Sequence, residues 1–190
     1  MPRTILKISG LVAAAAFSLG TAGTALGAVA SEQVNAGSLA FINSTPGNIA
    51  FPATTLDGTD QTKTQTQAFD VSDATGSNNG WSITATSTTF TAAGHNLSAN
   101  ATTIQGAPGV ACDAGSTCTP ASNSVSYPFT MPSAAVAPTA QKMFNAAANT
   151  GMGNQTVTPT WSLSVPSTTW AGGAANPYTA TWTFTLVSGP

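Results

Sequence analysis

Apolar and polar residues alternate along several short stretches of this chain. In the stretch PYTATWTFTLVSGP, the apolar side chains from Tyr178 to Leu186 fall on one side of an extended strand, and the threonines from Thr179 to Thr185 fall on the other. A period of two is what a pleated strand with one buried face requires. The stretch therefore predicts a β-strand that belongs to a sheet and buries one face in a folded domain.

Similar stretches recur along the chain, and turn residues separate them about every dozen positions. The pattern predicts an all-β fold, an antiparallel β-sandwich or partly closed barrel of about nine strands. The expected strands are Ser38 to Ile42, Ile49 to Phe51, Gln65 to Val71, Trp81 to Ser87, Ser98 to Ile104, Ser124 to Thr130, Gln141 to Ala148, Val157 to Val165 and Tyr178 to Val187.

Helix competes with strand in one place, AQKMFNAAAN, because Ala, Gln, Lys and Met are good helix formers. Met143, Phe144 and Ala147 also fall at helical spacing. We retain a strand there. Pro128, inside another expected strand, predicts that this strand lies at a sheet edge or a bulge.

The first 30 residues predict a signal peptide. Arg3 and Lys7 precede an apolar stretch diluted by Ala and Gly, and the residues AVA before Ser31 form a small-residue cleavage site. A membrane anchor is the alternative, but glycines interrupt the apolar run. We expect a mature chain of residues 31–190, one domain in size, with no membrane insertion after cleavage.

Few charges remain after such a cleavage. The basic residues are then Lys63 and Lys142 alone, against six acidic residues, and no arginine is left. Binding to nucleic acid or to an acidic membrane surface needs a basic patch, so neither partner is expected. The polar surface is predicted to consist of Thr, Ser, Asn and Gln.

The two cysteines, Cys112 and Cys118, lie in ACDAGSTC. In an oxidising compartment such a pair predicts a disulfide, which would stabilise the fold by roughly 2 kcal/mol. A metal or redox pair is the alternative, but it needs further ligands or a C-x-x-C spacing.

Residues with catalytic potential are few. His95, the single histidine, lies in TAAGHNLS, where Gly94 and Asn96 predict an exposed turn. Asp70 and Asp73 could hold calcium or act on a glycosidic bond, but Asp73 also suits a turn between two strands, and the full spacing of a calcium loop is absent. We expect no catalytic residues, no metal and no cofactor.

Tryptophans are the better candidates for binding. Trp81, Trp161 and Trp182 lie in alternating stretches and are expected in the core. Trp170 lies in the loop PSTTWAGGAANP, where its ring could stack on a sugar or fold back over the sandwich edge. The candidate binding residues are Trp170, Trp81, Trp182, Tyr178 and Asp73.

Several segments together resemble the WxL domain of Gram-positive surface proteins, in the form common among actinobacteria. They are GSLAFIN, FDVSDATGSNNGWSITATSTTF, AAANTGMG and LSVPSTTWAGGAANPYTATWTFTLVSGP. The first Trp-x-Leu motif is here Trp81-Ser82-Ile83 and the terminal one Trp182-Thr183-Phe184, while Trp161-Ser162-Leu163 matches the three letters. The resemblance implies a β-rich cell-surface domain that attaches non-covalently to wall peptidoglycan.

We therefore expect a secreted, non-enzymatic protein that binds cell-wall peptidoglycan or an associated glycan. No apolar tail follows Leu186, so attachment is expected to come from the folded surface. Three alternatives stay open: a structural subunit of a surface layer or fibre, whose strand edges pair between copies, a partner of other surface proteins, and an esterase or glycan hydrolase.

Overall fold

The computed structural model describes residues 29–190, and the predicted signal peptide lies almost wholly outside them. Within the described range the chain forms strands and no helix, so no helix there could span a membrane. Residues 35–190 form one compact unit, and all of the strands in the described range belong to it.

Three four-stranded sheets and one hairpin make up this unit. The first sheet has the order β1 (Leu39–Phe41), β3 (Phe69–Asp73), β12 (Gly153–Thr158) and β8 (Gly109–Cys112). The second has the order β2 (Gln61–Thr66), β13 (Thr160–Val165), β7 (Thr102–Ile104) and β9 (Phe129–Thr130). In the third, β4 (Trp81–Thr88) pairs with β10 (Ser133–Ala134), β11 (Gln141–Ala146) and β14 (Trp182–Ser188). The hairpin consists of β5 (Thr91–Ala92) and β6 (His95–Asn96).

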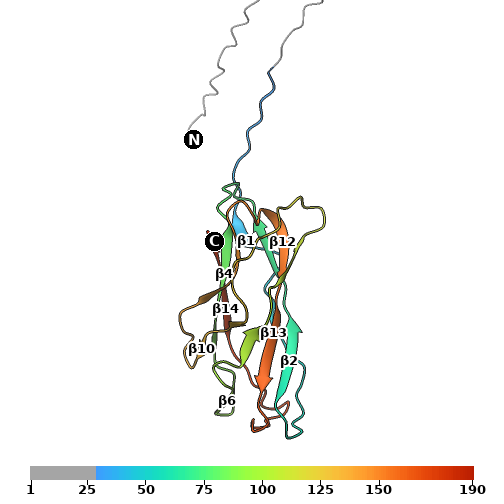
Figure 1. The fold of residues 1–190 in the computed structure, drawn as a ribbon, viewed down its shortest axis with the longest axis vertical. Helices are drawn as coiled ribbons and strands as arrows, with labels where there is room; N and C mark the ends of the chain where they lie inside the picture. Colours follow the sequence, from blue (N-terminus) through green and yellow to red (C-terminus); the bar gives the residue numbers. More distant parts are fainter. Residues whose placement is uncertain (1–28) are drawn as a thin grey trace, which may run out of the picture. The chain divides into compact units, whose positions relative to one another are not determined.

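The first two sheets continue into one another. Thr66 pairs with Thr160 and Phe69 with Val157, so the antiparallel register is the same on both sides of the break between them. At the break, the Gln67 N–H donates to the Pro159 carbonyl oxygen at 3.2 Å. Pro159 has no N–H to return, which interrupts the ladder without shifting it. These two sheets therefore form one layer, and β4 with its partners forms the other (Figure 1).

Aromatic side chains fill the space between the two layers. The Phe69 ring meets the Phe184 ring edge-on, with centroids 4.8 Å apart. The Trp161 and Trp182 rings have the same centroid separation. Because Trp182, Phe184 and Leu186 alternate with exposed residues, β14 closes one side of this core, as its sequence pattern predicted.

The all-β prediction is confirmed, and no sheet in the described range closes on itself, so the architecture is the open sandwich. The segment from Gln141 is a strand, β11, and not a helix. Pro128 directly precedes β9, which is the edge strand of its sheet, as expected.

Several predicted strand boundaries were wrong. The stretch from Val157 to Val165 is two strands broken at Pro159, and the stretch from Gln65 to Val71 belongs to two strands, β2 and β3. Residues Ile49 to Phe51 pack against the core without joining a sheet. Ser98 to Ile104 is a strand only from Thr102, Ser124 to Thr130 only from Phe129, and the terminal strand begins at Trp182.

Candidate functional site

The β5–β6 hairpin places His95 at one end of the sandwich. Ala93 and Gly94 form its turn with φ of 46° and 84°. Positive φ at both central residues matches the right-handed twist of the two flanking strands. The turn therefore fixes where the exposed His95 side chain leaves the backbone.

The loop that carries Trp170 is tied to this hairpin. Thr91 and Thr179 exchange backbone hydrogen bonds of 2.9 and 3.0 Å. Within the loop, the Tyr178 hydroxyl donates to the Trp170 carbonyl oxygen at 3.1 Å. At its start, the Ser167 N–H donates to Asp60 Oδ1 at 2.7 Å, and this hydrogen bond lowers the pKa of Asp60.

These ties bring the rings of Trp170 and His95 together. The two rings lie nearly parallel, with an interplanar angle of 10° and centroids 4.6 Å apart. Trp170 keeps 36% of its surface exposed. Trp170 thus neither projects freely nor folds into the core, because His95 covers one of its faces.

A shallow groove of about 450 Å³ lies beside this stack. No Asp, Glu, Lys or Arg lines it. The lining combines aromatic rings, an amide and hydroxyl groups: His95, Asn96, Leu97, Ser98, Pro166, Thr168, Thr169, Trp170 and Tyr178. An aromatic platform flanked by amide and hydroxyl groups suits a neutral ligand rich in hydroxyls. Such a surface can bind and orient a sugar.

Tyr178 also borders a second groove of about 590 Å³, which runs beside the segment that leads into β14. Trp182, Phe184 and the Pro46–Ile49 loop are part of its lining. Trp182 is half-buried and packs against Phe51, Phe90 and Trp161, so it belongs to the core as predicted.

Trp81 and Asp73 lie away from these grooves. Trp81 and Ser87, the partner of Trp182, are six residues apart along β4, which corresponds to about 20 Å. Trp81 has no exposed surface, and its Nε1–H donates to the Gly151 carbonyl oxygen at 2.8 Å. The structure therefore groups Trp170 with Tyr178 and separates both from Trp81 and Asp73.

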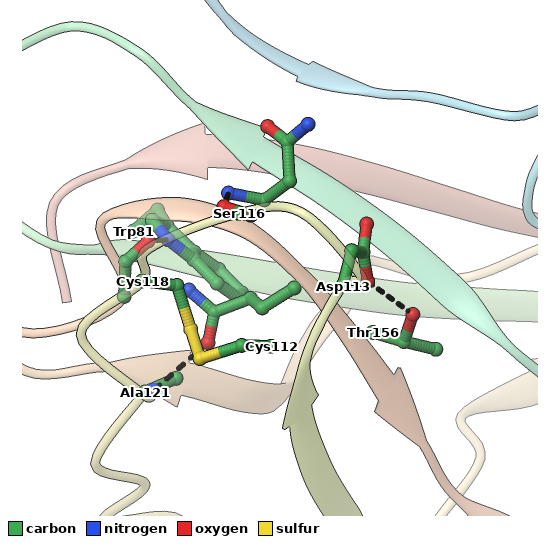
Figure 2. The surroundings of a disulfide bond; sticks show 10 residues. Trp81, Cys112, Asp113, Ser116, Cys118, Ala121 and Thr156 are labelled. Carbon is green, nitrogen blue, oxygen red and sulfur yellow. Dashed lines mark hydrogen bonds between the residues drawn. A yellow bond between two sulfur atoms is a disulfide. The ribbon is translucent and has the colours of Figure 1, made fainter.

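The predicted disulfide between Cys112 and Cys118 is present, with Cα atoms 5.6 Å apart, and it lies near Trp81 (Figure 2). The loop it closes rests on β12, since the Asn154 N–H donates to Ser116 Oγ and the Asp113 N–H donates to the Asn154 carbonyl oxygen, both at 3.0 Å. The disulfide therefore cross-links the chain at the end of the sandwich opposite Trp170.

The carboxylates make structural hydrogen bonds. Asp73 Oδ1 accepts from both the N–H and the hydroxyl of Thr75, at 3.1 and 2.7 Å, which is the turn that the sequence suggested. The Thr156 hydroxyl lies 2.8 Å from both Asp70 and Asp113 (Figure 2 shows the bond to Asp113). Within residues 29–190 no group of three or more His, Cys, Asp or Glu side chains gathers to hold a metal.

Two residues that matter here had no clear signal in the sequence. His95 was expected in an exposed turn, but nothing in its neighbourhood pointed to Trp170. Gln67 is buried, and its side-chain oxygen accepts from Trp161 Nε1–H at 3.1 Å while its amide nitrogen donates to the Gly47 carbonyl oxygen at 2.7 Å. Gln67 ends the polar stretch QTKTQTQ, and nothing in that stretch singled it out.

Comparison with known families gives one match. The model of a family described as WxL domain surface cell wall-binding matches residues 28–190. No curated protein and no solved structure matches the chain significantly.

Proposed function

Because this chain belongs to the WxL domain family, a family of surface cell wall-binding domains, we propose that it is secreted and attaches non-covalently to peptidoglycan or an associated wall glycan. We further propose that the groove beside Trp170 and His95 is its binding surface. Binding, not catalysis, is the proposed activity.

The observation that carries this proposal is the stack of Trp170 on His95 beside an uncharged, hydroxyl-rich groove. A sugar ring has apolar C–H faces that suit an aromatic ring, and its hydroxyls exchange hydrogen bonds with amides and hydroxyls. A wall glycan offers both in a repeating polymer. Since His95 and Tyr178 hold Trp170 in place, its ring needs little ordering when it binds, which favours affinity.

The surroundings of His95 support a role without catalysis. Within the described range, no carboxylate hydrogen-bonds to His95, and its one ring contact is Trp170. A general base needs a neighbour that orients it and a group from which it takes a proton. His95 is instead proposed to support the binding platform.

Sedimentation of the secreted protein with purified cell walls tests the proposal. We expect the wild-type protein in the pellet. Trp170→Ala should weaken binding about tenfold, equivalent to about 1.4 kcal/mol, and Trp170→Phe should weaken it less. Val136→Ala, which trims another exposed apolar residue, is the matched control and should bind like the wild type. Recovery of the wild type in the supernatant would reject wall binding, and full binding by Trp170→Ala would move the site elsewhere.

A further inference from the structure

Most sheet edges in this protein are protected against pairing with another strand. An edge strand presents unpaired N–H and C=O groups, and proteins protect such edges by keeping them short, by covering them or by placing lysine on them. In the first two sheets, the edge strands β1, β8 and β9 have only three, four and two residues. The longer edge strand β2 carries Lys63 near its middle.

The outer edge of β11 is covered as well. The Tyr127 hydroxyl donates to the Met143 carbonyl oxygen at 2.8 Å, and the Asn145 N–H donates to Asn123 Oδ1 at 3.1 Å. This strand also carries Lys142. Lys63 and Lys142 are the only lysines in residues 29–190, which contain no arginine, so both of these cations lie on edge strands.

β14 is not short and carries no lysine. β1 and the Pro46–Ile49 loop lie near it, but within residues 29–190 no hydrogen bond joins either of them to β14. It has seven residues, WTFTLVS, with no charge and no proline, and its pairing with β4 runs without a register shift. Within residues 29–190, β4 is its only strand partner. It is therefore the longest edge strand in this part of the chain that has no charge, no proline and no hydrogen-bonded cover on its outer edge.

The hydrogen-bond pattern shows which backbone groups are free to pair. The Thr88 N–H donates to the Thr181 carbonyl oxygen at 2.9 Å, and the Gly189 N–H donates to the Gly80 carbonyl oxygen at 3.0 Å. In an antiparallel pair this parity holds along the strand, so odd-numbered residues bond to β4. Trp182, Phe184 and Leu186 direct their N–H and C=O groups to the opposite edge.

A groove lies beside the segment that leads into β14 and the first half of this edge. It has a volume of about 590 Å³, runs along residues 178–184, includes the Pro46–Ile49 loop in its lining, and is lined by no charged side chain. An incoming strand would meet no fixed charge there. On the outer face, Val187 is 43% exposed and lies in line with the exposed Thr183 and Thr185.

We propose that β14 pairs antiparallel with β14 of a second copy, which joins the two third sheets into one continuous sheet across a twofold axis. A twofold interface uses the same patch on both partners, so the patch must be self-complementary. β14 meets this condition, because it carries no charge and presents threonines on one face and apolar side chains on the other, so that like faces meet in the pair. This hydrogen-bonding parity allows two registers, in which Phe184 lies opposite either Leu186 or Phe184 of the partner. In either register, the partner strand covers part of Val187 or of its neighbouring threonines.

Light scattering of the secreted protein, separated by size over about a hundredfold range of concentration, tests this pairing. We expect the mass to rise from one chain to two as concentration increases. In Thr185→Lys, two lysines meet opposite or diagonal to one another, so the association constant should fall at least about tenfold. Thr64→Lys adds the same charge at an exposed threonine on β2 and should leave association unchanged.

A charge swap makes the test specific to β14. Thr185→Lys and Thr185→Glu should each be monomeric, and their equimolar mixture should recover dimers. Urea unfolding checks that both variants fold, and Thr183→Lys serves if Thr185→Lys does not. A protein that stays monomeric at every concentration, or a dimer that Thr185→Lys leaves intact, would overturn the proposal. Because no wall is present in these experiments, their outcome is independent of wall binding.

Discussion

The indole ring of Trp170 lies parallel to the imidazole ring of His95, with the two centroids 4.6 Å apart. The two residues come from segments distant in the sequence, which the Thr91–Thr179 backbone pair brings together. An exposed aromatic ring in a glycine-rich loop would ordinarily sample many orientations. Here the stacked His95 ring restricts the orientation of the Trp170 ring. The effects of nearby substitutions on binding can therefore be predicted.

Gly172→Ala should weaken wall binding. A methyl group at this position would collide with the Trp170 ring and the Asn176 carbonyl oxygen, so the ring or the loop backbone that carries it must shift. We expect a loss of about threefold to tenfold in binding to purified walls, equivalent to about 0.7–1.4 kcal/mol. Gly106→Ala, where a methyl group meets nothing within 4 Å, is the control. Equal binding by the two variants would show that the orientation of Trp170 is unimportant.

Gln67→Leu should lower the free energy of unfolding by about 1–3 kcal/mol. The substitution leaves the buried Trp161 Nε1–H and the Gly47 carbonyl oxygen without their partner. Urea unfolding followed by tryptophan fluorescence measures the change. The same replacement at the exposed Gln105 should alter stability by less than about 0.5 kcal/mol, and a similar loss at both sites would argue against a role for this hydrogen bond.

Removing the disulfide with Cys112→Ala and Cys118→Ala should cost roughly 2 kcal/mol of stability, because the unfolded chain gains freedom. Wall binding should persist under conditions where the variant is folded, since the disulfide lies at the end opposite Trp170. Adding a reductant should bring the wild type to the stability of the variant and leave the variant unchanged. If binding is lost while the fold remains, the binding surface includes the disulfide end.

Acid should release the Trp170 loop only at low pH. Hydrogen bonds from the Ser167 backbone N–H, and then from its side chain, lower the pKa of Asp60 below its ordinary value. Because the pKa of Asp60 is lower in the folded protein, the Asp60–Ser167 hydrogen bond is fully present above the pKa that Asp60 has in the unfolded chain. The hydrogen bond is lost as the pH falls through the pKa of Asp60 in the folded protein. The Ser167 amide proton, followed by NMR, should therefore shift with a midpoint below the ordinary pKa of an aspartate. Asp60→Asn should abolish that shift, and a wild-type midpoint above the ordinary aspartate pKa would contradict the assignment.

The sequence predicts the fold class because the buried strands alternate clearly. The inward row of Trp182, Phe184 and Leu186 could be read directly from the period of two. β8, with the residues GVAC, could not, because it has little apolar alternation and exists only through its pairing with β12. The predicted strand from Ile49 to Phe51 was wrong for the opposite reason. The segment is apolar and contacts the core, but no neighbouring strand pairs with it.

The candidate site was predictable only in part. Trp170 was identifiable because it is a large ring in a loop of small and polar residues. Its contact with His95 depends on the backbone pair between Thr91 and Thr179, and nothing local to either segment specifies that pair. Contacts between distant segments of this kind are decided by the packing of the whole sandwich.

The positions of Lys63 and Lys142 also bear on how this protein withstands digestion. A trypsin-like protease cuts after lysine or arginine, and within residues 29–190 only these two bonds qualify. Both lie inside strands, β2 and β11, where the backbone must leave its ladder before it fits a protease. The loops, which are normally the first to be cut, offer such an enzyme no target in this range. The rate of tryptic cleavage should therefore report how often β2 or β11 opens.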